Sequence, residues 1–188
     1  MSLVTTKMVQ GGKLDLSKAA GDAGLTEVTV AIGWDENKAL AGDQFDADVT
    51  LVLTKDDETT EAGNVVFFNQ KTSADGSTIH NGDNLTGAGD GDDETIDVNL
   101  GLVNPALTKG IIYVSIYDAI ARNQNFGMLN NAFVRILNKT TGEELAKFDL
   151  EFDADTATSF RFGTLINRNG SWYFSAEKIA VAGGINEV

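Results

Sequence analysis

The residues best suited to chemistry lie in one run, residues 82–94, which holds five acids and four glycines. Carboxylates held this close repel one another unless a cation lies among them. Glycine lets the backbone curl so that side-chain and carbonyl oxygens converge on one point. From residue 72 to residue 108 the chain has seven acids and no Lys or Arg, so no cation within the segment neutralises them. This density of hard oxygen ligands predicts a Ca²⁺ site.

Further candidate ligands stand where expected strands begin or end. In a strand over 45–54 whose odd-numbered residues face inward, Asp46 and Asp48 share the opposite face, where both carboxylates can reach one cation. The alternative is a solvated face, the usual place of alternating Asp residues. Asp35 and Asn69 each lie near the end of an expected strand. A meander of strands brings all four to the same rim of a sandwich.

The strongest candidates follow the last glycine of the run. Asp92, Asp93 and Glu94 lead directly into the next expected strand, and Asp83 and Asn84 rank next. The expected cofactor is Ca²⁺, as two or more ions. The full expected ligand set is Asp35, Asp46, Asp48, Asn69, Asp83, Asn84, Asp90, Asp92, Asp93 and Glu94. Within this set Asp90 stands between glycines and is either a ligand or a solvated charge.

Other loop chemistries fit this run poorly. An EF-hand needs a twelve-residue ligand spacing between two helices, and both are missing. A Walker loop needs a Lys after its glycines, and a nucleotide phosphate here would face five carboxylates. The glycines are therefore interpreted as geometry for a cation.

Composition limits the class of protein. A chain of 188 residues favours one domain, and a net charge of −14 argues against a nucleic-acid partner, which needs clustered Lys and Arg. Without cysteine there is no disulfide and no thiol chemistry. The first residues show no basic start followed by an apolar region, and no apolar run approaches membrane-spanning length. We expect a cytoplasmic protein without direct membrane insertion.

Alternation with a period of two dominates the chain and predicts strands with one buried face. The Asn169-Gly170 pair predicts a tight turn between two of them, and a short helix is expected within 118–126. The sequence therefore predicts an all-β fold, a β-sandwich of two mainly antiparallel sheets with the Ca²⁺-binding loops at one rim. We expect a single domain over 11–184, with frayed termini at 1–10 and 185–188. Strands are expected at 28–34, 45–53, 65–68, 96–100, 111–117, 132–137, 145–150, 160–166 and 172–176.

Six ordered blocks closely resemble the tellurium-resistance TerD family, over about residues 13–184. The blocks are 33–35, 45–48, 67–70, 82–94, 118–127 and 131–136. The resemblance implies a β-sandwich that binds Ca²⁺ in a cluster of loops, loosely like a C2 domain. It also implies a place among bacterial stress operons for tellurite, phage and colicin resistance. Ala47 stands where the family commonly has Leu, a departure that removes no oxygen ligand.

An enzyme is the less favoured interpretation. With one histidine and no cysteine, a nucleophile would have to be a Ser, Thr or carboxylate activated by His80, and lone histidines are more often structural. We therefore predict a non-enzymatic Ca²⁺-binding module in a bacterial stress response. Ca²⁺ is expected to order the acidic rim so that it contacts a protein partner. The alternatives are a Ca²⁺ or metal buffer without a dedicated partner, and a carboxylate-dependent hydrolase.

Overall fold

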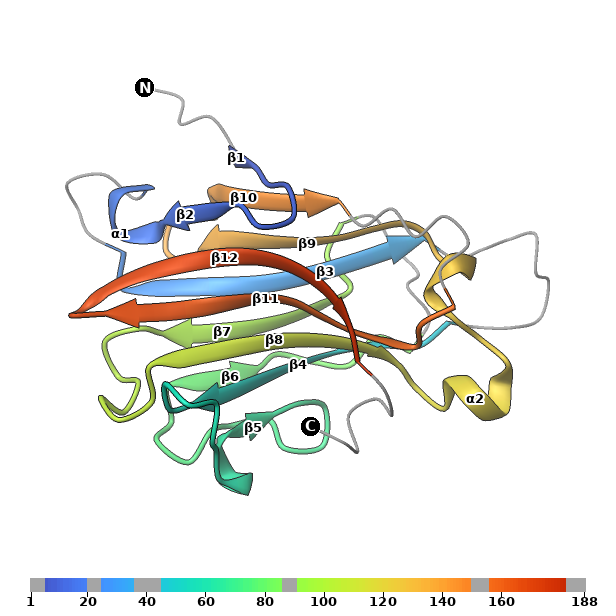
Figure 1. Ribbon diagram of the computed structural model, residues 1–188, viewed down its shortest axis with the longest axis horizontal. Coiled ribbons are helices and arrows are strands. Elements are labelled where there is room, and N and C mark those ends of the chain that lie inside the picture. The colour runs from blue at the N-terminus through green and yellow to red at the C-terminus, as the bar shows by residue number, and fades with distance from the viewer. Residues whose placement is uncertain (1–5, 20–24, 36–44, 86–90, 150–155, 182–188) are drawn as a thin grey trace.

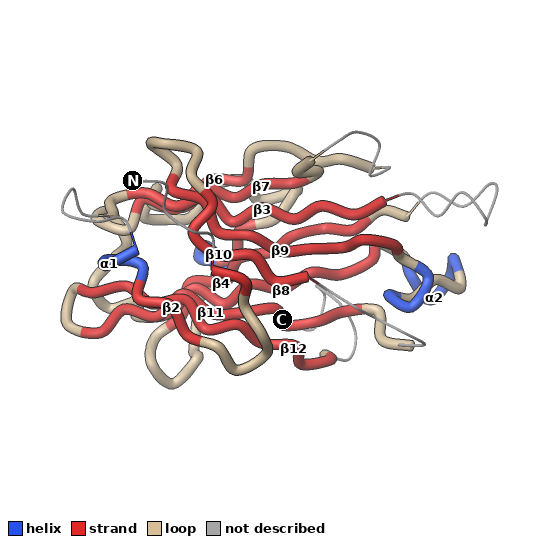
Figure 2. Tube along the Cα trace, turned by 90° about the horizontal axis from the view of Figure 1, so that it is seen from above, coloured by secondary structure: helices blue, strands red, loops and turns tan. Residues whose placement is uncertain are grey.

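Two six-stranded sheets pack face to face in the computed structural model, which describes residues 6–19, 25–35, 45–85, 91–149 and 156–181 (Figures 1 and 2). The first sheet has the order β1-β10-β9-β3-β7-β6, and the second has the order β2-β12-β11-β8-β4-β5. All the strand pairs are antiparallel except β1 with β10. This architecture confirms the predicted sandwich of two mainly antiparallel sheets.

Sixteen helices and strands follow one another along the described part of the chain. Their bounds are β1 Thr6–Lys7, β2 Lys13–Asp15, α1 Leu16–Ala19, β3 Glu27–Asp35, β4 Ala47–Thr54, η2 Ala62–Asn64, β5 Val65–Val66, β6 Thr78–His80, β7 Glu94–Asn99, β8 Lys109–Ile116, α2 Ala119–Arg122, η3 Phe126–Met128, β9 Asn130–Asn138, β10 Glu144–Asp149, β11 Ser159–Arg168 and β12 Ser171–Ala180. The short helix expected within 118–126 is α2.

The core lies between the sheets and is built by the predicted alternation. In β7 the residues Glu94, Ile96 and Val98 are buried while their neighbours are half-buried, and in β4 the odd-numbered residues belong to the core cluster. The tight turn between β11 and β12 is also confirmed, since Asn169 and Gly170 both have a positive φ, of 54° and 88°. This pair suits the twist of a two-residue hairpin.

Some boundaries differ from those expected. The strand predicted over 65–68 ends at Val66, because Phe67 and Gln70 bond across a tight turn that contains Asn69. Before residue 11, where the domain was expected to begin, β1 already pairs with β10, and Met8 is buried in the core. The single domain over 11–184 stays a prediction, and residues 1–5 and 182–188 lie outside the described residues.

Within the described ranges, none of the helices has the length and apolar character needed to cross a membrane.

Candidate metal centre

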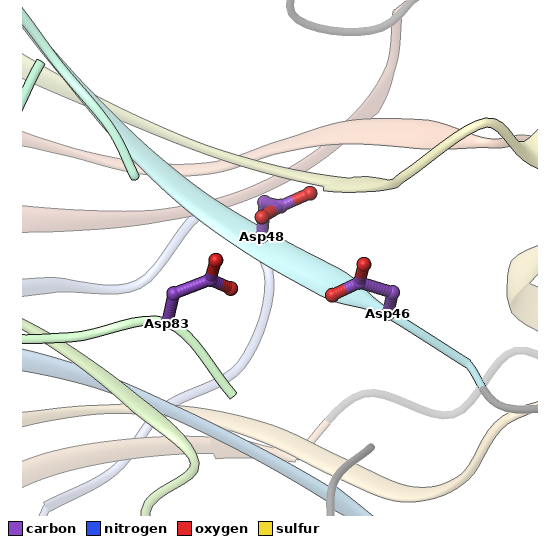
Figure 3. A group of neighbouring side chains, drawn as sticks. All are labelled: Asp46, Asp48 and Asp83. Atoms are coloured by element: carbon purple, nitrogen blue, oxygen red, sulfur yellow. The ribbon is translucent and has the colours of Figure 1, made fainter. Parts of the chain in front are cut away.

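Three carboxylates from two segments of the chain meet at one end of the sandwich. Asp46 lies directly before β4, Asp48 is the second residue of β4, and Asp83 comes from the segment that follows β6 (Figure 3). One oxygen of each carboxylate lies within 4.8 Å of the other two, and the three groups turn toward a common space. These three residues are called the acidic cluster below.

The two aspartates of β4 are not on a solvated face. Asp46 is 6% exposed and Asp48 4% exposed, although both lie on the side of the strand opposite to the core residues Ala47 and Val49. The alternative of ordinary surface charges is therefore wrong for this strand. Alternation identified the face on which they lie, but did not show that another part of the chain covers it.

Glu94 connects the two sheets beside this cluster. It is the first residue of β7 and points inward, and its carboxylate accepts the Val49 N–H at 2.8 Å and the Asn84 N–H at 3.4 Å. The Val49 bond lies on the edge of β4 that β5 pairs with only at Leu51 and Val52. Glu94 thus takes the place of a strand partner at the start of β4 and fixes the loop after β6 against it.

Asp93 anchors the same loop to the end of β3. Its carboxylate accepts the Trp34 N–H at 2.9 Å and the Asn84 side-chain N–H at 2.8 Å. The Trp34 indole N–H in turn donates to the Phe45 carbonyl at 3.2 Å, one residue before Asp46. These bonds fix β3, β4 and the acidic loop relative to one another.

The glycine before Trp34 permits this close approach. A Cβ on Gly33 would lie 2.4 Å from the Gly91 carbonyl oxygen and 2.5 Å from the Phe133 ring. Gly91 itself has a φ of +110°, a backbone conformation that L side chains rarely adopt. Two glycines on separate segments therefore allow Asp93 to reach the end of β3.

Burial and neighbouring acids raise the pKa values of Asp46 and Asp48, and burial raises that of Glu94. Burial first, then Glu94, Asp46 and Asp83, raise the pKa of Asp48 to about 8. The pKa of Asp46 is raised by burial and by the nearby charge of Asp83, and that of Glu94 is raised by burial. A buried carboxylate whose charged form is this unfavourable either retains a proton or binds a cation.

Within the described part of the chain, one cation lowers the pKa values of Asp46 and Asp48, but it only partly offsets the effect of burial. Arg122, at the end of α2, lowers the pKa values of Asp46 and Asp48, but less than burial raises them. Its guanidinium carbon lies 5.2 Å from the centre of the Tyr117 ring. Among the described residues, one buried oxygen of Asp46 has no hydrogen-bond partner, so the cluster has unused acceptor capacity.

Other acids of the run have partners within the chain. Arg135 on β9 binds both oxygens of Asp92, at 2.7 and 2.8 Å, and Lys139 pairs with Asp97 at 3.2 Å. The segment therefore does have neutralising cations, supplied by β9 and by the turn that follows it. Asp92 ranked among the strongest candidate ligands, yet in this geometry its carboxylate is already occupied.

Two of the remaining expected ligands, Asp35 and Asn69, are not members of the acidic cluster. Asp35 ends β3 and accepts the Asn131 side-chain N–H at 2.6 Å. Burial first, and then the charges of Asp92 and Asp35, raise the pKa of Asp93. Asn69 is exposed in the turn after β5. Asp90 lies outside the described residues. Within those residues the structure gives one convergent group, so the expectation of two or more ions stays a prediction.

One histidine and two arginines that were not among the expected ligands also lie beside the candidate ligands. His80 is fully buried, accepts the Gly82 N–H at 3.3 Å through Nδ1, and places Nε2 3.7 Å from a Glu94 oxygen. These contacts hold the loop after β6, which agrees with the expectation that a lone histidine is more often structural. The arginines Arg122 and Arg135 lie within two of the six recognised blocks, but spacing alone gave them no role.

The donor set suits a hard divalent cation. Ca²⁺ binds carboxylate oxygens at about 2.3–2.6 Å, so two ligands on opposite sides of one ion lie up to about 5 Å apart. The three oxygens of the acidic cluster lie within 4.8 Å of one another, which is compatible with that limit. Mg²⁺ takes shorter bonds of about 2.0–2.1 Å and would require a tighter group.

Comparison with known proteins identifies the family. The TerD domain matches residues 4–188. General stress protein 16U of Bacillus subtilis (strain 168) is 41% identical over 186 residues, covering 98% of this chain and 95% of that protein. Tellurium resistance protein TerD of Serratia marcescens is 39% identical, with the same two coverages of 98% and 95%.

Solved structures share the fold. The structure of a homologue of telluride resistance protein (TerD) from Streptomyces coelicolor A3(2) superposes with a TM-score of 0.68 at 22% identity, covering 87% of this chain and 95% of that one. A protein of unknown function superposes with a TM-score of 0.70 at 21% identity, covering 87% and 94%. The resemblance carried by the six blocks is confirmed, and the chain belongs to the TerD domain family, whose members include proteins named for tellurium resistance and general stress.

Proposed function

We propose that the chain is a Ca²⁺-binding, non-enzymatic module of a bacterial stress response that acts in the cytoplasm. The observation that carries this proposal is the convergence of carboxylate oxygens of Asp46, Asp48 and Asp83 within 4.8 Å, where Asp46 and Asp48 are buried and Asp83 is exposed. Buried carboxylates held together in a fold need either protons or a cation, and one oxygen of Asp46 has no hydrogen-bond partner among the described residues. Asp46, Asp48 and Asp83 would hold the ion, with Glu94 beside them.

The mechanism is electrostatic ordering. Without a cation, repulsion among the three carboxylates opposes the approach of the loop after β6 to β4. Ca²⁺ would remove this repulsion and cross-link the loop to the strand, so that the surface around the cluster becomes fixed. A fixed surface is what a binding partner can recognise at a low entropic cost.

Contact with a protein partner is supported by apolar side chains that remain exposed beside the cluster. Ile120 on α2 is 86% exposed, Tyr117 and Leu85 are also exposed, and the Tyr117 N–H donates to the Asp46 carbonyl at 2.8 Å. Large exposed apolar and aromatic residues grouped near one site are typical of interaction surfaces. We therefore place the partner on this end of the molecule.

The test combines calorimetry with partner capture. Titration with Ca²⁺ should give saturable heat for the unmodified protein and for Ile120→Ser, but not for Asp48→Asn. Capture of partners from a bacterial lysate should require Ca²⁺, be lost in chelator, and be lost in both variants. No heat on titration would refute the metal site. Ca²⁺ binding with capture that chelator leaves unchanged would favour the metal buffer without a dedicated partner.

A further inference from the structure

The second sheet carries a hollow of about 450 Å³ that involves none of the candidate metal ligands. It lies over β2, β11 and β12, on their outer face. Phe174 and Leu165 point into the core, whereas Tyr173, Ser175 and Ile166 lie at alternate positions and line the hollow. The volume is within the range of about 300–1,000 Å³ typical of small-molecule sites.

The strand register places this hollow far from the acidic cluster. Asp48 pairs with Ser115 of β8, and Ser115 pairs with Ser159 at the start of β11. Ile166, in the hollow, pairs instead with Lys109, at the other end of β8. At about 3.3 Å for each strand residue, the two sites are roughly 20 Å apart. Figure 1 shows the same separation, with α1 and α2 at opposite ends of the sandwich.

The hollow gathers positive charge in an acidic protein. Lys13, Lys18 and Arg168 line it, although the chain has 28 acids and only 14 Lys and Arg residues. Asp15 is the one acid in its lining and pairs with Lys18 at 3.0 Å. Neither Lys13 nor Arg168 makes an ion pair within the described part of the chain.

The lining also offers an apolar floor and free hydroxyls. Ile166 and the half-buried Tyr173 ring provide the apolar surface. Within the described residues, the hydroxyls of Tyr173 and Ser175 make no hydrogen bond. Unpaired cations and hydroxyl donors around an apolar floor match an anionic group attached to a flat or apolar body.

We propose that this hollow binds a small organic phosphate, with the phosphate held by Lys13, Lys18 and Arg168 and the organic part lying on Tyr173 and Ile166. Lys and Arg are the residues that bind phosphate oxygens through charge-assisted hydrogen bonds. Asp15 holds Lys18 in place and still leaves the lining with a net positive charge. The site is separate from the proposed Ca²⁺ function and would persist if that function failed.

The test uses 1-naphthyl phosphate, whose fluorescence reports binding, with the purified protein at an ionic strength of about 0.1 M, where the Debye length is about 10 Å. We expect saturable binding that weakens roughly tenfold or more in the double variant Lys13→Gln with Arg168→Gln, because each charge-assisted hydrogen bond contributes strongly. The matched control is Lys55→Gln with Lys71→Gln, which removes the same net charge from outside the hollow. This control should change the affinity by less than about twofold, since distant exposed charges are screened.

Two further probes separate the parts of the proposal. We expect 1-naphthol, which lacks the phosphate, not to bind, and inorganic phosphate to bind more weakly than 1-naphthyl phosphate. Absence of saturable binding by 1-naphthyl phosphate would overturn the proposal. An equal loss of affinity for 1-naphthyl phosphate in both double variants would also overturn it, because binding would then depend only on the overall charge of the protein. Equal affinity for 1-naphthol would show a merely apolar hollow, and equal affinity for inorganic phosphate would remove the role of Tyr173 and Ile166.

Discussion

Replacing Asp48 by Asn is expected to have opposite effects on the metal-free and the Ca²⁺-bound protein. In the fold, burial and neighbouring acids raise the pKa of Asp48 to about 8 from an ordinary value of 3.8. Between about pH 4 and pH 8 the unfolded chain has therefore released this proton while the folded chain retains it. Because the folded state binds more protons, stability falls as pH rises through this window.

The size of the effect follows from the same two pKa values. At pH 7 the carboxyl must stay protonated about three pH units above its ordinary pKa, which costs about 4 kcal/mol at 1.36 kcal/mol for each unit. Asn does not ionise and avoids this cost, although burying its amide without full hydrogen bonding costs about 1–3 kcal/mol. Asp48→Asn should therefore stabilise the metal-free protein at pH 7 by about 1–3 kcal/mol.

Urea unfolding in chelator at pH 4 and pH 7, with and without Ca²⁺, measures these terms. The gain of Asp48→Asn should be present at pH 7 and absent at pH 4, where Asp48 costs nothing. In Ca²⁺ the unmodified protein should gain stability and the variant should not. Asp56→Asn, in the exposed turn after β4, is the control and should stay within about 0.5 kcal/mol of the unmodified protein.

Two results would refute this reasoning. Destabilisation of metal-free Asp48→Asn at pH 7 would show that the carboxylate has stabilising partners. A difference from the unmodified protein that is the same at both pH values would show that ionisation of Asp48 does not control stability.

Three other outcomes follow from the same site. Ca²⁺ at a hundredfold excess over its dissociation constant should raise the free energy of unfolding by about 3 kcal/mol, and a melting curve unchanged between Ca²⁺ and chelator would contradict the site. Ca²⁺ affinity should rise with pH up to about 8, because the ion displaces the proton of Asp48. Calorimetry at pH 7 in buffers of different ionisation enthalpy should show that about one proton is released for each ion bound. A binding heat that does not depend on the buffer would exclude this displacement. The protein should not reduce tellurite, since it has no cysteine and no dinucleotide-binding motif; protein-dependent oxidation of NADH or NADPH with formation of elemental tellurium, above a heat-killed control, would disprove this.

Much of the fold could be predicted because its long strands carry a clear period. The buried run of β8 and the Asn169-Gly170 turn are local signals, and the structure contains both. The short strands β1, β2 and β6 have two or three residues each, too few for any period to show. Pairing with the distant strands β10 and β12 places β1 and β2, and pairing with β7 places β6.

The sequence could predict which residue types form the candidate site, but not which residues contact them in the fold. The sequence identified Asp46 and Asp48 as neighbours on one face, but not that Glu94 would reach the start of β4 from the other sheet. Asp92 ranked high because it follows the last loop glycine and leads into the next expected strand. Its partner Arg135 becomes a neighbour only through the pairing of β3 with β9. Contacts between sheets depend on long-range topology, which local spacing does not encode.

The bond from Glu94 to Val49 has a consequence for synthesis of the chain. The acidic cluster takes two ligands from the start of β4 and one from beyond β6, so it exists only after both sheets have docked. A contiguous calcium loop can bind its ion as soon as it leaves the ribosome, whereas this site must wait until β7 has emerged and packed. An isolated peptide of residues 82–94 would hold only one member of the cluster. Ion capture here would therefore report completed tertiary assembly, and a nascent or misfolded chain would not compete for the cation.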